Sequence, residues 1–259
     1  MQKWIKNGLL LALLCVLPGG MADAEEIQQI GQGHFTGTIS HDLEGNIVLD
    51  FTDIQLTLPS GWSGKCAIKA GEDNVTFYQK GSYDLWAQEG AADGGRLFEI
   101  SFSQYADYLD LPSYESVGTT AEGYYYVEYP TDFGGYTGDE NVVAEFQQMQ
   151  DGVEEIVDSV EIKNSAVPQN TGYILPLSST NALEKSELEG MDQNQVQMAI
   201  NEIYARHHRK FTIEEVRDYF ETQPWYSGYI EPEDFDVYQL NTTERGNIDL
   251  MIEYMKELG

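Results

Sequence analysis

The chain has 259 residues, with 44 acidic and 14 basic side chains and a formal net charge of −30. A surface this acidic repels nucleic acid, anionic lipids and anionic wall polymers. The composition therefore argues against a nucleic-acid-binding protein and favours cationic partners or divalent ions. Acidity also keeps a secreted protein soluble, which is the simpler explanation.

Residues 1–24 have the pattern of a secretory signal peptide. Lys3 and Lys6 precede an apolar run, and Ala22-Asp23-Ala24 supplies the small residues of a cleavage site. The run is too short for a transmembrane helix, which needs roughly 20 residues. We expect a secreted protein, extracellular or at the cell surface, with no transmembrane anchor after cleavage.

Cleavage at this site would change both the charge and the cysteine content. It would leave 12 basic and 43 acidic residues, a formal charge of −31, and Cys66 as the single cysteine. An internal disulfide would then be impossible, so we expect the fold to depend on its apolar core.

Residues 25–163 predict an α+β domain. Short apolar runs, such as residues 47–51 and 54–58, alternate with polar residues at the period of a β-strand and end at turn residues. From Val142 to Val160, apolar residues instead recur every three or four positions, which predicts one long helix over about residues 140–159. We expect an antiparallel sheet with this helix packed on one face.

Two short sequence segments, together with this order of elements, carry a resemblance to known domains. Residues 58–62 read Leu-Pro-Ser-Gly-Trp and residues 94–98 read Gly-Gly-Arg-Leu-Phe. With them, the N-terminal half resembles the sheet-plus-helix domains of the PsbP and Mog1 type and the N-terminal halves of uncharacterised secreted proteins of Gram-positive bacteria. The resemblance implies a fold and no particular chemistry.

Residues 164–172 are small and polar and predict a linker, after which residues 173–259 become helical in pattern. At three places a capping side chain stands three residues ahead of a Glu or Gln, which predicts three helix starts: Asp192 with Gln195, Thr212 with Glu215, and Asn241 with Glu244. We expect a compact helical module with the long loop of residues 223–240 across it.

This C-terminal third also carries an ordered series of short motifs: Tyr173 to Pro176, Glu187-Leu188, Asn201 to His207, Tyr219-Phe220, Pro224 to Tyr226 and Asn247-Ile248. In these motifs it resembles the YARHG domain, a small extracellular module of bacterial proteins. The resemblance implies a location and an architecture, but no established activity.

One residue departs from the family pattern, because His208 stands where the family has its glycine. A glycine just past a helix end adopts the left-handed backbone at no steric cost. A histidine in that conformation costs roughly 1 kcal/mol. We expect either a strained cap or a helix that continues slightly further.

Arg206 is the first candidate binding residue. It follows Glu202 by four positions, which predicts a helix-stabilising ion pair. Alternatively, Arg206 forms a polar cluster with Asn201 and Tyr204 that docks the third helix near Asn247, or its guanidinium is presented to an anionic ligand.

Three aromatic residues are further candidates. Trp225 and Tyr226 predict either a plug between helices or a surface that stacks on sugar rings or a peptide. Tyr125 faces the opposite side of its strand from Tyr124 and Tyr126, so we expect a partly exposed aromatic strip.

No pattern predicts a metal, a cofactor or catalytic residues. His207 and His208 are neighbours on a helix and point about 100° apart, so they do not share one ion easily. Cys66 lacks a local catalytic signature. The main hypothesis is a secreted, non-enzymatic binding or interaction protein of the bacterial cell envelope, whose partner is an unknown envelope glycan or protein. Two alternatives stay open: a secreted hydrolase with Cys66 as nucleophile, and a structural spacer.

Overall fold

The structure is a computed structural model that describes residues 28–91, 93–106 and 111–259. The signal peptide predicted for residues 1–24 lies outside the described residues. By their contacts, the described residues fall into two compact units: residues 28–102 with 125–164, and residues 103–124 with 165–259.

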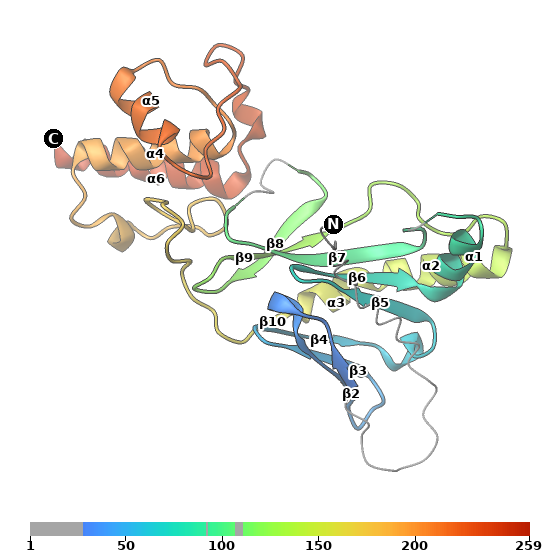
Figure 1. Cartoon of the computed structure of the whole chain (residues 1–259). Coiled ribbons are helices and arrows are strands. Elements are labelled where there is room, and N and C mark those ends of the chain that lie inside the picture. The colour runs from blue at the N-terminus through green and yellow to red at the C-terminus, as the bar shows by residue number, and fades with distance from the viewer. Residues whose placement is uncertain (1–27, 92, 107–110) are drawn as a thin grey trace, which may run out of the picture. The chain divides into compact units, whose positions relative to one another are not determined.

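The described residues contain ten strands in two five-stranded sheets (Figure 1), with the orders β1-β2-β3-β4-β10 and β5-β6-β7-β9-β8. The strands are β1 (Gln28–Ile30), β2 (Gly37–His41), β3 (Ile47–Phe51), β4 (Ile54–Leu58), β5 (Cys66–Ala70), β6 (Asn74–Gln79), β7 (Arg96–Ser103), β8 (Tyr114–Thr119), β9 (Tyr124–Glu128) and β10 (Glu161–Ile162). The predicted α+β class is confirmed, although the strands divide between two sheets.

The hairpin of β3 and β4 illustrates why these segments form strands. Their residues alternate between buried and partly or fully exposed, as the period of two requires. The antiparallel register sets Leu49 opposite Leu56, and both are buried. A one-residue slip would turn the whole apolar face toward water, so this register is strongly specified.

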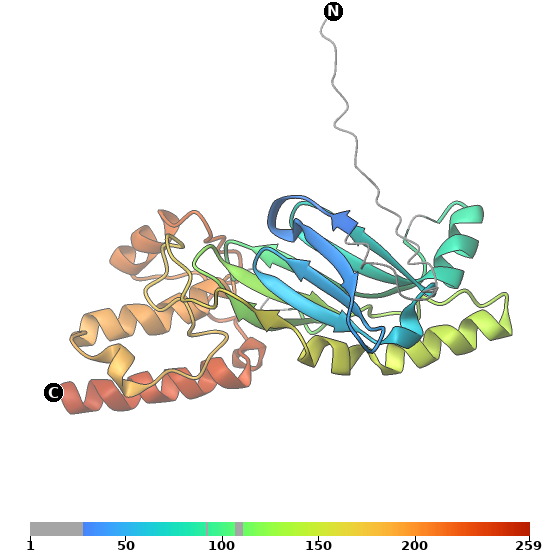
Figure 2. The same ribbon diagram turned by 90° about the horizontal axis from the view of Figure 1, so that it is seen from below.

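Three helices belong to the first unit: α1 (Lys80–Gln88), α2 (Glu140–Asp151) and α3 (Val153–Asp158). The helix expected over residues 140–159 is thus divided at Gly152, the residue with the lowest helix propensity in the segment. Figure 2 shows α2 and α3 following one another in nearly one line. The apolar stripe runs through both, because Phe146, Met149 and Ile156 are buried.

The second unit contains α4 (Gln193–Arg206), α5 (Glu214–Glu221) and α6 (Thr242–Leu258), with short 3-10 turns at Lys185–Leu188 and Val237–Gln239. Figures 1 and 2 show α4 and α6 side by side. They run antiparallel, since Gln193 at the start of α4 donates to the carbonyl of Met255 near the end of α6. Their shared core includes Val196, Ile200, Ile203 and Met251.

Two of the three predicted capping boxes are confirmed. Asp192 and Asn241 cap α4 and α6 and exchange hydrogen bonds with Gln195 and Glu244. The box at Thr212 is wrong, because α5 begins after Ile213 with no side-chain cap. Among the described residues, no helix combines the length and apolar character needed to cross a membrane.

Candidate functional site

The motif of residues 201–207 forms the last two turns of α4, and its charged residues turn inward. Arg206 is 6 % exposed, and its guanidinium lies 2.6 Å from the carboxylate of Glu202. It also donates to Oγ of Ser179 and to the carbonyl of Leu175, each at 2.9 Å. The guanidinium carbon lies 4.0 Å from the centre of the Tyr173 ring. The predicted ion pair is present, and the guanidinium is enclosed by the interior.

Glu202 serves a second purpose, since its carboxylate accepts the backbone N–H groups of Ile174 (2.5 Å) and Leu175 (3.1 Å). Burial raises its pKa above the ordinary value, against the opposing effect of Arg206 and these two amides. Burial alone would lower the pKa of Arg206, but the charge of Glu202 and its other neighbours raise it. Arg206 therefore stays cationic. The pair fastens residues 174–175 to α4.

A second buried network joins α4 to α6. The side chains of His207 and Glu244 are both 0 % exposed, and the imidazole Nε2 lies 2.9 Å from each carboxylate oxygen. One turn further along α6, Asn247 accepts the N–H of Leu183 (2.8 Å) and donates to the carbonyl of Ser178 (2.7 Å). These polar residues hold loop segments against the helices.

His208 ends α4 in the left-handed conformation expected of the family's glycine, with φ of 60°. Its N–H donates to the carbonyl of Ala205 and the N–H of Arg209 to that of Tyr204, which is the Schellman pattern of a helix end. The helix does not run on. The imidazole Nδ1 lies 2.9 Å from the carbonyl of Ser227, and the ring stacks on Tyr229 at 4.6 Å. The histidine thus combines a strained backbone with specific contacts.

Trp225 and Tyr226 are partly buried and pack against α5. The Trp225 ring lies 4.7 Å from Tyr173 and 6.0 Å from Phe220. The hydroxyl of Tyr226 donates to the carbonyl of Arg209 at 3.0 Å. Both residues fill space between segments of the second unit, which is the structural alternative considered for them.

The partly exposed aromatic strip expected around Tyr125 is wrong, because Tyr124, Tyr125 and Tyr126 are all buried. Tyr125 packs against Phe102 and donates its hydroxyl to the Asp53 carboxylate at 3.1 Å. Strand alternation does place neighbouring tyrosines on opposite faces. It does not reveal that both faces are covered.

Cys66 lies within β5 and is 1 % exposed. Burial raises the pKa of its thiol to about 12, and its Sγ is 3.7 Å from the carbonyl of Ala67. A nucleophile needs a thiolate at neutral pH, which this environment opposes. Among the described residues, no group of three His, Cys, Asp or Glu side chains is arranged to hold a metal ion.

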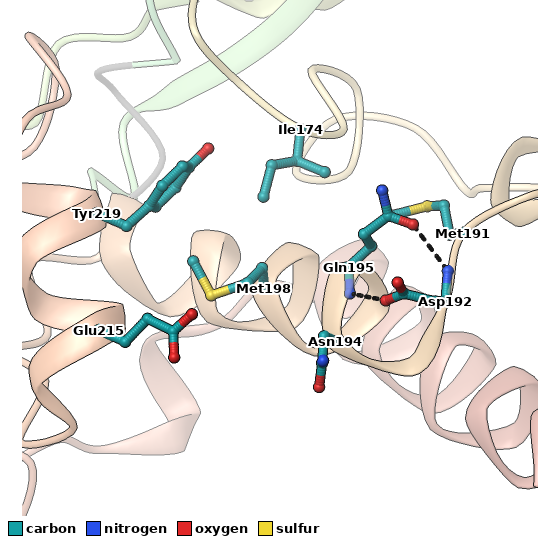
Figure 3. A pocket seen from close by; sticks show the side chains of 8 residues that line it. All are labelled: Ile174, Met191, Asp192, Asn194, Gln195, Met198, Glu215 and Tyr219. Carbon is teal, nitrogen blue, oxygen red and sulfur yellow. Dashed lines mark hydrogen bonds between the residues drawn. The ribbon is translucent and has the colours of Figure 1, made fainter.

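A pocket of about 390 Å³ opens where α4, α5 and the segment around Ile174 meet. In Figure 3, the side chains of Ile174, Met198 and Tyr219 face a common space, and the carboxylate of Glu215 lies beside Met198. The complete lining is Ile174, Met191, Asp192, Asn194, Gln195, Met198, Glu215 and Tyr219. Sequence reasoning proposed none of these as binding residues, because the pocket exists only once two helices and a distant loop are in place.

Comparison with protein families gives one match, in which residues 171–256 correspond to the YARHG domain. No curated protein and no solved structure matches the chain, so the resemblance of the N-terminal half to other domains is not supported. The matched residues contain the two buried networks, the helix end at His208 and the pocket. The C-terminal third of this chain is therefore a YARHG domain.

Proposed function

We propose that this chain is a secreted, non-enzymatic binding protein of the bacterial cell envelope. The family match supports an extracellular bacterial protein, and the signal peptide expected at residues 1–24 agrees with it. The observation that carries the proposal is where the charged residues of the motif and the open pocket lie in the YARHG domain. The reactive-looking residues Glu202, Arg206 and His207 are enclosed by the interior, whereas an apolar pocket stays open on its surface.

Such an arrangement suits binding better than catalysis. A catalytic acid or base must reach a substrate proton, and a side chain with no exposed surface does not. An open pocket lined by apolar groups and a few polar ones is the usual form of a binding site. The spacer alternative leaves this pocket without a purpose.

The test uses the expected mature chain, residues 25–259, and two fractions of the bacterial envelope. Purified peptidoglycan freed of anionic polymers and an extract of surface proteins immobilised on beads are each incubated with the chain. We expect saturable retention by one fraction at physiological salt. Absence of retention by both would contradict the proposal and favour the spacer.

The hydrolase alternative is tested by Cys66→Ala. The binding proposal expects the same retention as for the unchanged chain, because Cys66 is buried in β5 of the first unit and is not part of the YARHG domain. A cysteine-dependent hydrolase predicts measurable turnover of ester or peptide substrates that this variant abolishes. Such turnover would replace the proposal.

A further inference from the structure

The pocket between α4 and α5 leaves several large apolar side chains incompletely covered. Ile174, Met198 and Tyr219 pack against the two cores of the unit on one side and are only partly buried. Ligand sites range over roughly 300–1,000 Å³. At about 390 Å³ this pocket is among the smaller ones, so it suits one or two apolar side chains better than an extended ligand.

Two methionines make the pocket adaptable. Met191 stands just before the N-cap of α4, and Met198 lies two turns further on. The unbranched thioether side chain changes rotamer at little cost and covers apolar groups of different shapes. Surfaces that bind varied apolar side chains use methionine for this reason.

The charge around the pocket has one sign. No lining residue is basic, and Asp192 and Glu215 are both exposed. Asp192 already accepts the N–H of Gln195, but the carboxylate of Glu215 has no hydrogen bond or ion pair among the described residues. Over residues 165–259 there are 17 acidic and 7 basic side chains, a formal charge of −10. A cation approaching the pocket is therefore attracted at long range.

We propose that this pocket binds a cationic polypeptide segment of a partner protein. One apolar side chain of the segment enters between Ile174, Met198 and Tyr219, and a flanking lysine or arginine pairs with Glu215. The charge argues against a second copy of this chain, which would bring the same negative field to the interface. This inference rests on the proposed binding function and narrows its partner to a cationic protein.

The probe is a short synthetic peptide in which one leucine stands between pairs of lysines, with glycine and serine elsewhere. Binding to the mature chain is measured by fluorescence polarisation. One control peptide replaces leucine by serine, and another replaces every lysine by glutamate. We expect each control to bind at least about tenfold more weakly. We also expect affinity for the leucine–lysine peptide to fall with added salt, because its charges are screened.

Two variants with matched controls locate the site. Met198→Lys fills the pocket with a positive charge, which repels the lysines of the peptide. Gln197→Lys adds the same positive charge to the exposed face of α4. Glu215→Lys reverses the rim charge, and Glu214→Lys does so on the same helix outside the lining. We expect both pocket variants to weaken binding about tenfold or more and both controls to weaken it no more than about threefold. Glu215 is exposed, so its variant keeps the test valid even if Met198→Lys fails to fold.

Two results would overturn the inference. One is that the leucine–lysine peptide does not bind, or binds no better than its glutamate control. The other is that Glu215→Lys and Glu214→Lys bind it equally. If the envelope fractions still retain the chain in either case, the binding function stands and only this partner assignment fails. Loss of retention by both fractions would instead remove the proposed function.

Discussion

Replacing Arg206 by methionine tests whether the buried ion pair holds the YARHG domain together. Methionine has a similar length but no charge, so Glu202 keeps its two backbone donors and loses its counter-ion. Removing one partner of a buried pair costs about 3–5 kcal/mol, chiefly because the other charge is left uncompensated. The lost contacts with Ser179 and the Tyr173 ring act in the same direction. We expect a loss of about 4 kcal/mol in the free energy of unfolding.

A double-mutant cycle separates the pair from its surroundings. Glu202→Gln alone leaves the guanidinium of Arg206 buried without a carboxylate and should also cost about 3 kcal/mol. Ile174 and Leu175 donate to different carboxylate oxygens of Glu202, so the single amide oxygen of glutamine accepts only one of these N–H groups and its –NH2 faces the other. In the double variant no buried charge remains, so its cost should be smaller than the sum of the two by about 2–3 kcal/mol.

Because the described chain forms two units, the readout must report on the second one alone. Hydrogen exchange of peptides from α4 and α6, followed as a function of urea, gives that local free energy. Peptides from β3 and β4 serve as the control and should not change. An additive cycle, or a loss below about 1 kcal/mol for Arg206→Met, would refute the reasoning, because charges paired at 2.6 Å inside a core must be coupled.

Three further predictions follow from single sites. The free energy of unfolding should be about 1 kcal/mol higher for His208→Gly than for His208→Ala, because both lose the contact with Ser227 and only glycine relieves the left-handed backbone. Equal stability of the two variants in urea would contradict the strain. Asn247→Asp places a carboxylate beside two backbone carbonyls, so burial should raise its folded pKa above the unfolded value of about 4. Its stability should fall as the pH rises from about 4 to that folded pKa, whereas Asn247→Leu should show no such slope. Cys66 should react with a thiol reagent only on unfolding. Burial raises its pKa from 9.0 to about 12, so its contribution to stability is complete below pH 9 and then falls by about 1.4 kcal/mol per pH unit up to about pH 12. Cys66→Ala should lack that slope.

Local signals in the sequence predicted local structure well. The capping boxes at Asp192 and Asn241 are correct because a side chain and an amide three residues apart decide them. The box at Thr212 fails because the same spacing occurs one residue before the helix that forms. Helix α1 was not expected, and its N-cap is Gln79, a residue that gives no strong start signal.

Properties that depend on distant segments were beyond the sequence. The pairing of Glu202 with Arg206 is local and could be predicted, but its partners Ser179 and Leu175 lie 27 and 31 residues from Arg206. Burial of Tyr125 depends on Phe102 and Asp53, from other strands and turns. The pocket combines residues 174, 191–198 and 215–219, so no single stretch of the chain contains its signal.

The chemistry of the motif explains where the function should be sought. A run that contains Glu, Arg and His suggests an active site, yet each of these groups is buried with a partner that neutralises or satisfies it. Arg206 has three acceptors and an aromatic face, and His207 has both oxygens of Glu244. These contacts lower the cost of burial, although Nε of Arg206 has no hydrogen-bond partner among the described residues. The groups are structural because their side chains have almost no surface that a ligand can reach. Under the proposed binding function, we expect recognition to depend on side chains that reach solvent, such as Met198 and Glu215 in the pocket.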